Sequence, residues 1–403
     1  MKKFLLLLII VFELSANNFL QAQWVQTYQK NGIACFTVSG SNLFAGNYEG
    51  VYLSTDNGTN WTTINNGLTN TYVRALAVSG TNIYAGSFSV FLSTNNGTNW
   101  TKVDNGLPYG DLVYCIEISG ANIFAGTQGS GVYLTTNNGI SWNAINNGLD
   151  LVNNRILALA VSGTNIYAAT DKGIFLSTNN GTNWTLVENY PSFDSFAVSN
   201  RYIIAGQYDY GVFLCSPDLP DFWVFAANQG LTSHVYALKV YGTYLFAGTE
   251  KGGVFLSTNY GSSWNSVNTG LTEGTSIGSF AVSGSYLFAG GDAGVWRRPL
   301  SDFGITAVES EKYKLPTDFV LEQNYPNPFN PTTIIKFSVP NSQFVTLKVH
   351  DMLGREVTTL VNEEKLPGNY EVKFNGSNLS SGVYFYRLQA GSYSDTKRFI
   401  LMK

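Results

Sequence analysis

Val78-Ser79-Gly80-Thr81-Asn82-Ile83-Tyr84-Ala85-Gly86 is one copy of a segment that recurs along most of the chain. The other copies cover residues 38–46, 118–126, 161–169, 198–206, 240–248 and 282–290. A short apolar stretch such as Gly50-Val51-Tyr52-Leu53 follows each copy, and most repeats then reach a tryptophan. Repeats of roughly 40 residues that each hold several strands are typical of propeller blades.

Each repeat predicts four short β-strands. Apolar and β-branched runs are separated by Ser-Gly, Ala-Gly and Asn-Gly pairs, which are turn signals. In the first strand, Leu76 and Val78 alternate with small residues, as expected for a sheet that is buried on both faces. No helical periodicity is visible, so we expect an all-β protein.

The two ends of the repeat region predict a closed ring. Six repeats are complete, and residues 280–297 supply only three strands of the last one. The N-terminal stretch Trp24-Val25-Gln26-Thr27-Tyr28 aligns with Trp61-Thr62-Thr63-Ile64-Asn65, the last strand of a repeat. A strand donated from the N-terminus would leave no open sheet edge between the chain ends. We therefore expect a seven-bladed β-propeller over residues 23–300, closed by its N-terminal strand.

A second motif lies in the turn before each tryptophan. Ser54-Thr55-Asp56-Asn57-Gly58-Thr59-Asn60-Trp61 resembles the Asp-box of bacterial-neuraminidase-type repeats, with Asn in place of Asp in later copies. Its side chains suit a structural role, because a short amide or carboxylate bonds its own turn and glycine permits positive φ. The structural residues expected are Asp56, Gly58, Trp61, Asn95, Gly97, Trp100, Asn137, Gly139, Trp142, Asn179, Gly181, Trp184, Asn259, Gly261 and Trp264. The fifth repeat (216–223) lacks the glycine and the seventh has no such turn, so we expect both to differ in shape.

The N-terminus predicts export. Lys2 and Lys3 precede an apolar run from Phe4 to Phe12, and Ala22 provides a small residue for cleavage. We expect residues 1–22 to be a signal peptide, because Glu13 ends the run well short of a membrane span. Cys35, Cys115 and Cys215 lie in separate repeats and are expected to be small apolar residues rather than disulfide partners.

The C-terminal part resembles the type A sorting domain of type IX secretion. After a polar linker over residues 301–316, the motif Asn324-Tyr325-Pro326-Asn327-Pro328-Phe329-Asn330-Pro331 opens a second domain over residues 317–403. Alternating strands predict a small antiparallel β-sandwich there. The resemblance implies recognition by the type IX secretion machinery, removal on arrival, and release or attachment to surface lipopolysaccharide. An ordinary adhesion or carbohydrate-binding sandwich is the alternative.

Composition excludes several functions. The chain carries 23 Lys and Arg against 27 Asp and Glu, and its basic residues are scattered, so it has no basic stripe for nucleic acid. His234 and His350 fall in different domains, and no ligand spacing suits zinc or calcium. We expect no metal and no cofactor.

Ligand binding is expected on the face formed by the loops that precede the first strand and join the second to the third. Aromatic residues enriched there could stack sugars or anchor a protein. The candidate binding residues are Tyr72, Arg74, Tyr109, Arg155, Tyr190, Tyr208, Asp209, Tyr210, His234 and Tyr236. An ordinary solvated loop surface is the alternative interpretation of this composition.

Two enzymatic interpretations of the sequence compete with binding. A sialidase needs three converging arginines and a tyrosine nucleophile, but the early Arg-Ile-Pro motif of that family is missing. Gly274-Thr275-Ser276-Ile277-Gly278 fits a serine-nucleophile pattern, yet it lies in a repeat loop and not in a strand-turn-helix setting. We therefore predict no catalytic residues and a non-enzymatic binding or adhesion module on the cell surface, with a secreted glycan-active hydrolase as the alternative.

Overall fold

The computed structural model describes residues 22–29, 32–151, 155–199, 201–209, 211–306, 316, 318–340, 343–365, 367–391 and 393–403. Nearly all regular structure in these residues is β-strand, and the helix among them is the 3-10 turn η1 (Leu300–Phe303). The prediction of an all-β protein is confirmed. Residues 1–21 of the predicted signal peptide and residues 307–315 of the predicted linker lie outside the described residues.

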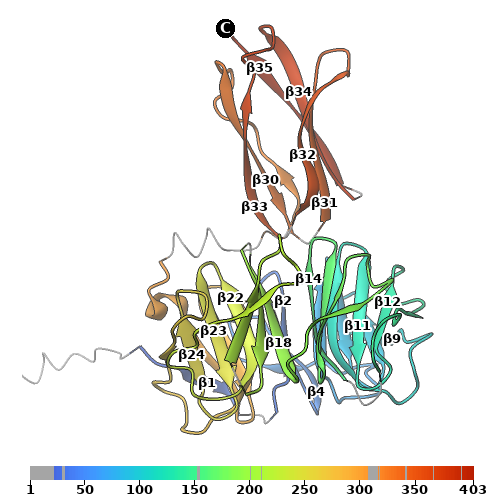
Figure 1. Cartoon of the computed structure of the whole chain (residues 1–403), viewed down its shortest axis with the longest axis vertical. Coiled ribbons are helices and arrows are strands. Elements are labelled where there is room, and N and C mark those ends of the chain that lie inside the picture. Colours follow the sequence, from blue (N-terminus) through green and yellow to red (C-terminus); the bar gives the residue numbers. More distant parts are fainter. Residues whose placement is uncertain are drawn as a thin grey trace, which may run out of the picture.

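The repeats form antiparallel four-stranded sheets (Figure 1), which we call blades and name after their first strand. The β2 blade consists of β2 (Cys35–Ser39), β3 (Asn42–Asn47), β4 (Gly50–Ser54) and β5 (Thr62–Thr63). The β6 blade consists of β6 (Ala75–Ser79), β7 (Asn82–Gly86), β8 (Val90–Ser93) and β9 (Thr101–Lys102). The β10 blade consists of β10 (Val113–Ser119), β11 (Asn122–Thr127), β12 (Val132–Thr135) and β13 (Asn143–Ala144). The β14 blade consists of β14 (Ile156–Ser162), β15 (Asn165–Thr170), β16 (Gly173–Ser177) and β17 (Thr185–Glu188). The β18 blade consists of β18 (Phe193–Val198), β19 (Ile203–Gln207), β20 (Gly211–Cys215) and β21 (Trp223–Phe225). The β22 blade consists of β22 (Val235–Tyr241), β23 (Tyr244–Thr249), β24 (Val254–Ser257) and β25 (Asn265–Ser266).

The β26 blade combines both ends of the repeat region. Its strands are β26 (Ile277–Ser283), β27 (Tyr286–Gly291), β28 (Gly294–Pro299) and, on the outside, β1 (Val25–Tyr28). Val25 lies opposite Arg297 in the β1–β28 pair. Trp24, just before β1, is buried, and its indole N–H donates a 2.8 Å hydrogen bond to the carbonyl of Val267 in the β22 blade.

The first strands of successive blades contact one another in chain order. These contacts run from β2 to β6, β10, β14, β18, β22 and β26, and β26 in turn contacts β2. The first strands are therefore the innermost strands of the assembly.

Adjacent blades approach closely at one repeated glycine of the second strand. A Cβ atom on Gly86 would lie 2.9 Å from Val113 of the next blade, and one on Gly126 would lie 2.5 Å from Ile156. Equivalent glycines face the next blade at Gly46 (Val73), Gly206 (Val235), Gly248 (Ile277) and Gly290 (Ile33). Since almost any side chain here would push two blades apart, the Ala-Gly pair of the repeat is a packing requirement. In β15 this position is Ala169.

The turns that resemble the Asp-box are held by their own side chains. In the β6 blade, the Asn95 carboxamide oxygen accepts hydrogen bonds from Ser93 Oγ and from the backbone N–H of Asn99, both at 2.9 Å. Gly97 donates its N–H to Ser93 Oγ at 2.8 Å and adopts a φ of +79°. Trp100 then donates its indole N–H to Ile64 O of the preceding blade at 2.7 Å. The internal bonds of this turn recur around Asp56, Asn137, Asn179 and Asn259.

The three cysteines are unpaired and protected. Cys215 is buried, and Cys35 and Cys115 are half-buried. Burial raises the thiol pKa of Cys35 and of Cys115 to about 12, and that of Cys215 to about 11. All three therefore stay protonated at neutral pH, which makes them unreactive.

The C-terminal residues form two antiparallel sheets around one core. The strands are β29 (Val320–Leu321), β30 (Thr332–Val339), β31 (Gln343–His350), β32 (Glu356–Lys365), β33 (Gly368–Asn375), β34 (Gly382–Ala390) and β35 (Tyr393–Leu401), in the orders β29-β30-β33 and β32-β31-β34-β35. Ile335 and Phe337 of one sheet share the core with Leu347 and Val349 of the other. Alternate residues of β30 are buried, as the period of a strand requires.

Gly97→Ala should destabilise the protein. Its new methyl group would face Ile64 Cδ1 at 2.2 Å in a backbone conformation that L-residues rarely adopt. We expect a loss of about 1–3 kcal/mol in the free energy of unfolding, measured by denaturant titration. Gly80→Ala is the control, because Gly80 also has positive φ but no atom within 4 Å of an added Cβ. Equal stability of the Gly97 variant and the wild type would contradict a packing role for this turn.

Candidate functional site

The predicted binding residues come together because of the antiparallel order of each blade. The end of a blade where the first strand begins is also the end where the second strand finishes. Arg74 and His234 directly precede β6 and β22, and Asp209 follows β19. We call this end of the propeller the loop face.

The densest group on the loop face surrounds His234. The imidazole Nδ1 lies 3.2 Å from Glu250 Oε2, and Nε2 lies 3.6 Å from Asp209 Oδ1. The Tyr208 ring lies against the imidazole, with the two ring centroids 3.9 Å apart. Nδ1 is buried and makes no hydrogen bond of good geometry. Tyr208 and Asp209 belong to the β18 blade, whereas His234 and Glu250 belong to the β22 blade. Tyr208, Asp209 and His234 are among the binding residues that the sequence predicts.

Tyr236 extends this group toward the propeller centre. Its ring centroid lies 6.4 Å from that of Tyr208. Burial first, and then the negative charge of Glu250, raise the pKa of the Tyr236 hydroxyl to about 12. The hydroxyl therefore stays protonated at neutral pH and acts as a hydrogen-bonding group rather than as a nucleophile.

Two predicted arginines occupy the other side of the loop face. The Arg74 guanidinium lies over the Tyr114 ring at 5.1 Å, and its buried Nε has no hydrogen-bond partner among the described residues. Arg155 binds Asp171 through two bonds, Nη2–Oδ1 at 2.7 Å and Nε–Oδ2 at 2.9 Å. The hydrogen bond to Asp171 raises the pKa of Arg155 further above its usual range. Of these two arginines, Arg74 is therefore the one whose guanidinium can still donate hydrogen bonds to a ligand.

Asp194 connects the two sides and was missed by the sequence analysis. It is half-buried in β18 at the register shift between Phe193 and Ser195, which is the position that Tyr236 holds in β22. Burial raises the pKa of its carboxyl to about 6, and the nearby positive charges of Arg155 and Arg74 partly oppose that rise. Aligning the repeats by strand register would have found it, because Arg74 and Tyr114 hold the same position in their blades.

Two further charged residues that the sequence analysis missed lie farther along the inner strands. Glu117 in β10 and Lys239 in β22 stand at equivalent register positions, opposite Phe124 and Phe246. The other blades have Thr37, Ala77, Ala160, Ala197 and Ala281 there. Burial raises the pKa of Glu117 to about 7 and lowers that of Lys239, while each charge partly offsets the shift of the other. Glu117 and Lys239 are therefore the two charged residues among small ones at this level of the inner strands.

The other predicted residues that the structure describes, Tyr72, Tyr109 and Tyr190, have different surroundings. Tyr72 stacks on Tyr48 with centroids 4.7 Å apart and also contacts Phe88 at 5.7 Å, so its ring faces are used in packing. Tyr109 is fully exposed. Tyr190 packs on Phe213 at 5.3 Å. Tyr210 lies outside the described residues.

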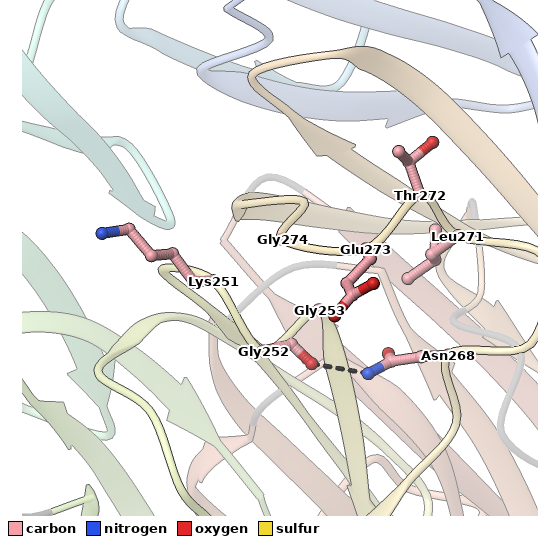
Figure 2. A pocket seen from close by; sticks show the side chains of 8 residues that line it. All are labelled: Lys251, Gly252, Gly253, Asn268, Leu271, Thr272, Glu273 and Gly274. Carbon is pink, nitrogen blue, oxygen red and sulfur yellow. Dashed lines mark hydrogen bonds between the residues drawn. The ribbon is translucent and has the colours of Figure 1, made fainter.

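A small hollow lies between the β22 and β26 blades (Figure 2). Its volume is about 240 Å³, and its lining residues are Lys251, Gly252, Gly253, Asn268, Leu271, Thr272, Glu273 and Gly274. The Asn268 side chain is occupied in holding the backbone, because it accepts from Val254 N–H and donates to Gly252 O. Figure 2 shows Lys251 extending away from the other lining side chains. The hollow thus lies between the β23–β24 loop and the segment that leads from β25 to β26.

The Gly274–Gly278 segment is a connecting loop over residues 274–276 and then the start of β26. The backbone N–H of Ser276 donates to the Asp292 carboxylate at 3.2 Å, so Asp292 contacts the main chain of Ser276. In the described part of the chain, His, Cys, Asp and Glu side chains do not gather in a group that could hold a metal ion. The same residues form no helix with the length and apolar character of a membrane span.

The proline motif of the C-terminal domain is bonded into its core. Phe329 is buried and packs edge-on against Phe374 and Phe399. The Asn327 carboxamide oxygen accepts the Ile400 N–H at 2.9 Å, and Phe329 N–H donates to Ile400 O at 3.0 Å. The motif, including Pro326, Pro328, Asn330 and Pro331, thus runs beside the last strand of the chain.

Two protein families match parts of the chain. Residues 323–402 match a family described as the secretion system C-terminal sorting domain, and residues 69–207 match the DUF6242 β-propeller domain. No curated protein matches the chain in sequence. The chain therefore combines a β-propeller with a type IX sorting domain, which indicates export to the cell surface or the extracellular space.

Solved structures agree with the propeller fold. YCF48 bound to D1 peptide is 14% identical, with a TM-score of 0.55 over 69% of this chain and 96% of that chain. YCF48 from Cyanidioschyzon merolae gives the same identity and TM-score over 70% of this chain and 100% of that chain. The GH74 xyloglucanase from Xanthomonas campestris is 13% identical, with a TM-score of 0.54 over 86% of this chain and 63% of that chain. At such identities the likeness concerns the fold alone.

Asp194→Asn should stabilise the protein at neutral pH. Because the folded-state pKa of about 6 exceeds the ordinary 3.8, the folded protein holds this proton more tightly than the unfolded chain does. The contribution of Asp194 to stability is therefore lost as the pH rises from about 4 to about 6. Above pH 6 the variant should exceed the wild type by about 1–3 kcal/mol in free energy of unfolding, and below pH 4 the two should agree. If the difference in free energy of unfolding between variant and wild type stayed constant across this pH range, the raised pKa of the Asp194 carboxyl would be contradicted.

Proposed function

We propose that this secreted propeller is a non-enzymatic binding or adhesion module whose ligand docks on the loop face. The observation that carries the proposal is the group around His234, where Tyr208, Tyr236, Glu250 and Asp209 converge from two blades. Aromatic rings beside charged groups suit a polar ligand such as a surface glycan or a protein segment. YCF48, a propeller of similar fold, is described with a bound D1 peptide, which supports a protein segment.

The arrangement of the arginines supports binding over sialidase-type hydrolysis. Arg155 is committed to Asp171, and Arg201 lies over Tyr202 and Tyr260 near an Asp-box-like turn. Arg297 binds the turn at Asn57 and Thr59, and Arg298 binds Val267 O and Asp302. A sialidase would need three arginines converging on one carboxylate. The alternative, a glycan-active hydrolase, draws on the likeness to the GH74 xyloglucanase.

We further propose that the propeller is a seven-bladed ring that the N-terminal strand closes, and that its turns are Asp-boxes. The contact of β26 with β2, the β1–β28 pair and the approach of Gly290 to Ile33 support closure. The internal bonds of the turns support the Asp-box assignment. We also propose that residues 1–22 are a signal peptide removed on export. The predicted domain limits, residues 23–300, 301–316 and 317–403, stay predictions.

Removal of residues 23–28 should weaken the closed ring. The deletion exposes the β28 edge and takes away buried Trp24, which packs against the β22 blade. We expect the free energy of unfolding to fall by about 2–5 kcal/mol, measured by denaturant titration of the secreted protein. Val25→Thr is the control, because it changes an exposed side chain of the same strand. A deletion variant as stable as the wild type would exclude closure by this strand.

Substitution of the His234 group should weaken binding and leave the fold intact. The test begins with glycan and peptide arrays, together with a hydrolysis assay on the array hits. Tyr208→Ala with His234→Ala should weaken binding of the best hit by about 1–3 kcal/mol, because central aromatic contacts typically contribute that much. Binding is measured by titration calorimetry.

The control for this experiment is Tyr260→Asn. Tyr260 has φ +54° in the turn of the β22 blade, and the equivalent residues Asn57, Asn96, Asn138 and Asn180 show that the turn accepts asparagine. The control should bind like the wild type. Binding that survives the Tyr208 and His234 changes, or turnover of an array hit, would refute the proposal.

A further inference from the structure

The outer strand of the β18 blade has an unusual surface. In other blades the two residues after the tryptophan are mostly polar and exposed, as in Thr62-Thr63, Thr101-Lys102, Asn143-Ala144 and Asn265-Ser266. In β21 they are Val224 and Phe225, with 43% and 52% of their surfaces exposed. Among the described outer strands, β21 alone carries apolar residues at both positions.

The turn before β21 adds to this apolar surface. It is the turn that lacks the Asp-box pattern, and it is closed by backbone bonds from Leu219 N–H to Ser216 O and from Phe222 N–H to Leu219 O. Side chains add two bonds, because Ser216 Oγ accepts from Asp218 N–H and Cys215 Sγ donates to Leu219 O, both at 3.3 Å. Leu219 and Phe222 take no part in these bonds through their side chains and point outward, with 58% and 62% of their surfaces exposed. We call Leu219, Phe222, Val224 and Phe225 the edge patch.

The edge patch wraps around a free strand edge. Val224 pairs with Leu214 and Phe225 with Phe213, so their side chains project from opposite faces of the sheet. Phe225 continues an aromatic row, with ring centroids 5.2 Å from Phe213, which in turn lies 5.3 Å from half-exposed Tyr190. β21 is the last strand in its sheet order. Apolar residues on both sides of an unpaired edge favour an added strand over a flat protein contact.

The charge around the edge patch determines which partner fits. Asp218 and Asp221 are exposed within the same turn. Between residues 173 and 231 the single basic residue is Arg201, which lies over Tyr202 and Tyr260. A second copy of this chain would bring like charges together, which costs binding energy. Lysine or arginine on the partner would instead meet opposite charge.

We propose that the edge patch binds an extended apolar segment of another protein, flanked by basic residues, which adds to the β18 blade as a further strand. The main chain of the segment would pair with β21, and its side chains would cover Val224 and Phe225 on the two faces. Its basic ends would lie near Asp218 and Asp221. This site is separate from the His234 group and does not depend on the function proposed for it.

The test uses the secreted full chain and two labelled synthetic peptides. One has the sequence Lys-Lys-Val-Ile-Val-Phe-Val-Lys-Lys, and the other replaces every Lys by Glu. Fluorescence anisotropy should show saturable binding of the Lys peptide, at least about tenfold tighter than that of the Glu peptide. Val224→Thr with Phe225→Thr, which copies β5, should weaken binding of the Lys peptide by at least about tenfold.

A second variant keeps the proposal testable if the first fails to fold. Asp218→Asn with Asp221→Asn changes exposed side chains only and should reduce the difference between the two peptides. Thr101→Ala with Lys102→Ala, on the outer strand of the β6 blade, should bind like the wild type. Equal affinity for the two peptides, no saturable binding, or unchanged affinity in the edge-patch variants would overturn the proposal. So would sedimentation showing that the wild type, but not the Val224 and Phe225 variant, forms a dimer.

Discussion

The close approach between a glycine of each second strand and the start of the next blade underlies the whole propeller. The space at Gly86 and its equivalents is filled by Val or Ile from the neighbouring blade, so each blade is complete only when the next is in place. The same approach recurs between Gly290 of the β26 blade and Ile33, which lies just before the first strand of the β2 blade. The turns between the third and fourth strands are held both by this packing and by their own Ser-Asn-Gly hydrogen bonds.

The proposed binding site lies at the opposite end of the blades from these turns, whose geometry recurs from blade to blade. The turn side chains are occupied in their own bonds, whereas several polar groups of the loop face keep unused capacity. Arg74 Nε has no partner among the described residues, and burial raises the pKa of the Asp194 carboxyl to about 6. A ligand that carries hydrogen-bonding and charged groups would satisfy these side chains, and that gives the loop face its binding potential.

The repeat pattern predicted the strands well because each strand has the same neighbours in every blade. It also predicted that Tyr208, Asp209 and His234 would share one face of the propeller, but not that they would contact one another. It did not predict Asp194, Glu117 or Lys239, because a charged residue inside a β-strand gives no loop signal, and its position depends on register around the ring. The sequence did not predict the edge patch for a related reason. It showed the altered turn at 216–223, but the exposure of Val224 and Phe225 depends on which strand is outermost in the sheet.

Backbone hydrogen exchange of the secreted protein, with and without the ligand that arrays select, tests the central claim most directly. Ligand docking on the loop face predicts slower exchange in residues 205–209, 233–237 and 248–252, which carry Tyr208, His234 and Glu250. Exchange in the turns around Asn95 and Asn137 should be unchanged. Protection confined to those turns, with none around His234, would contradict the account.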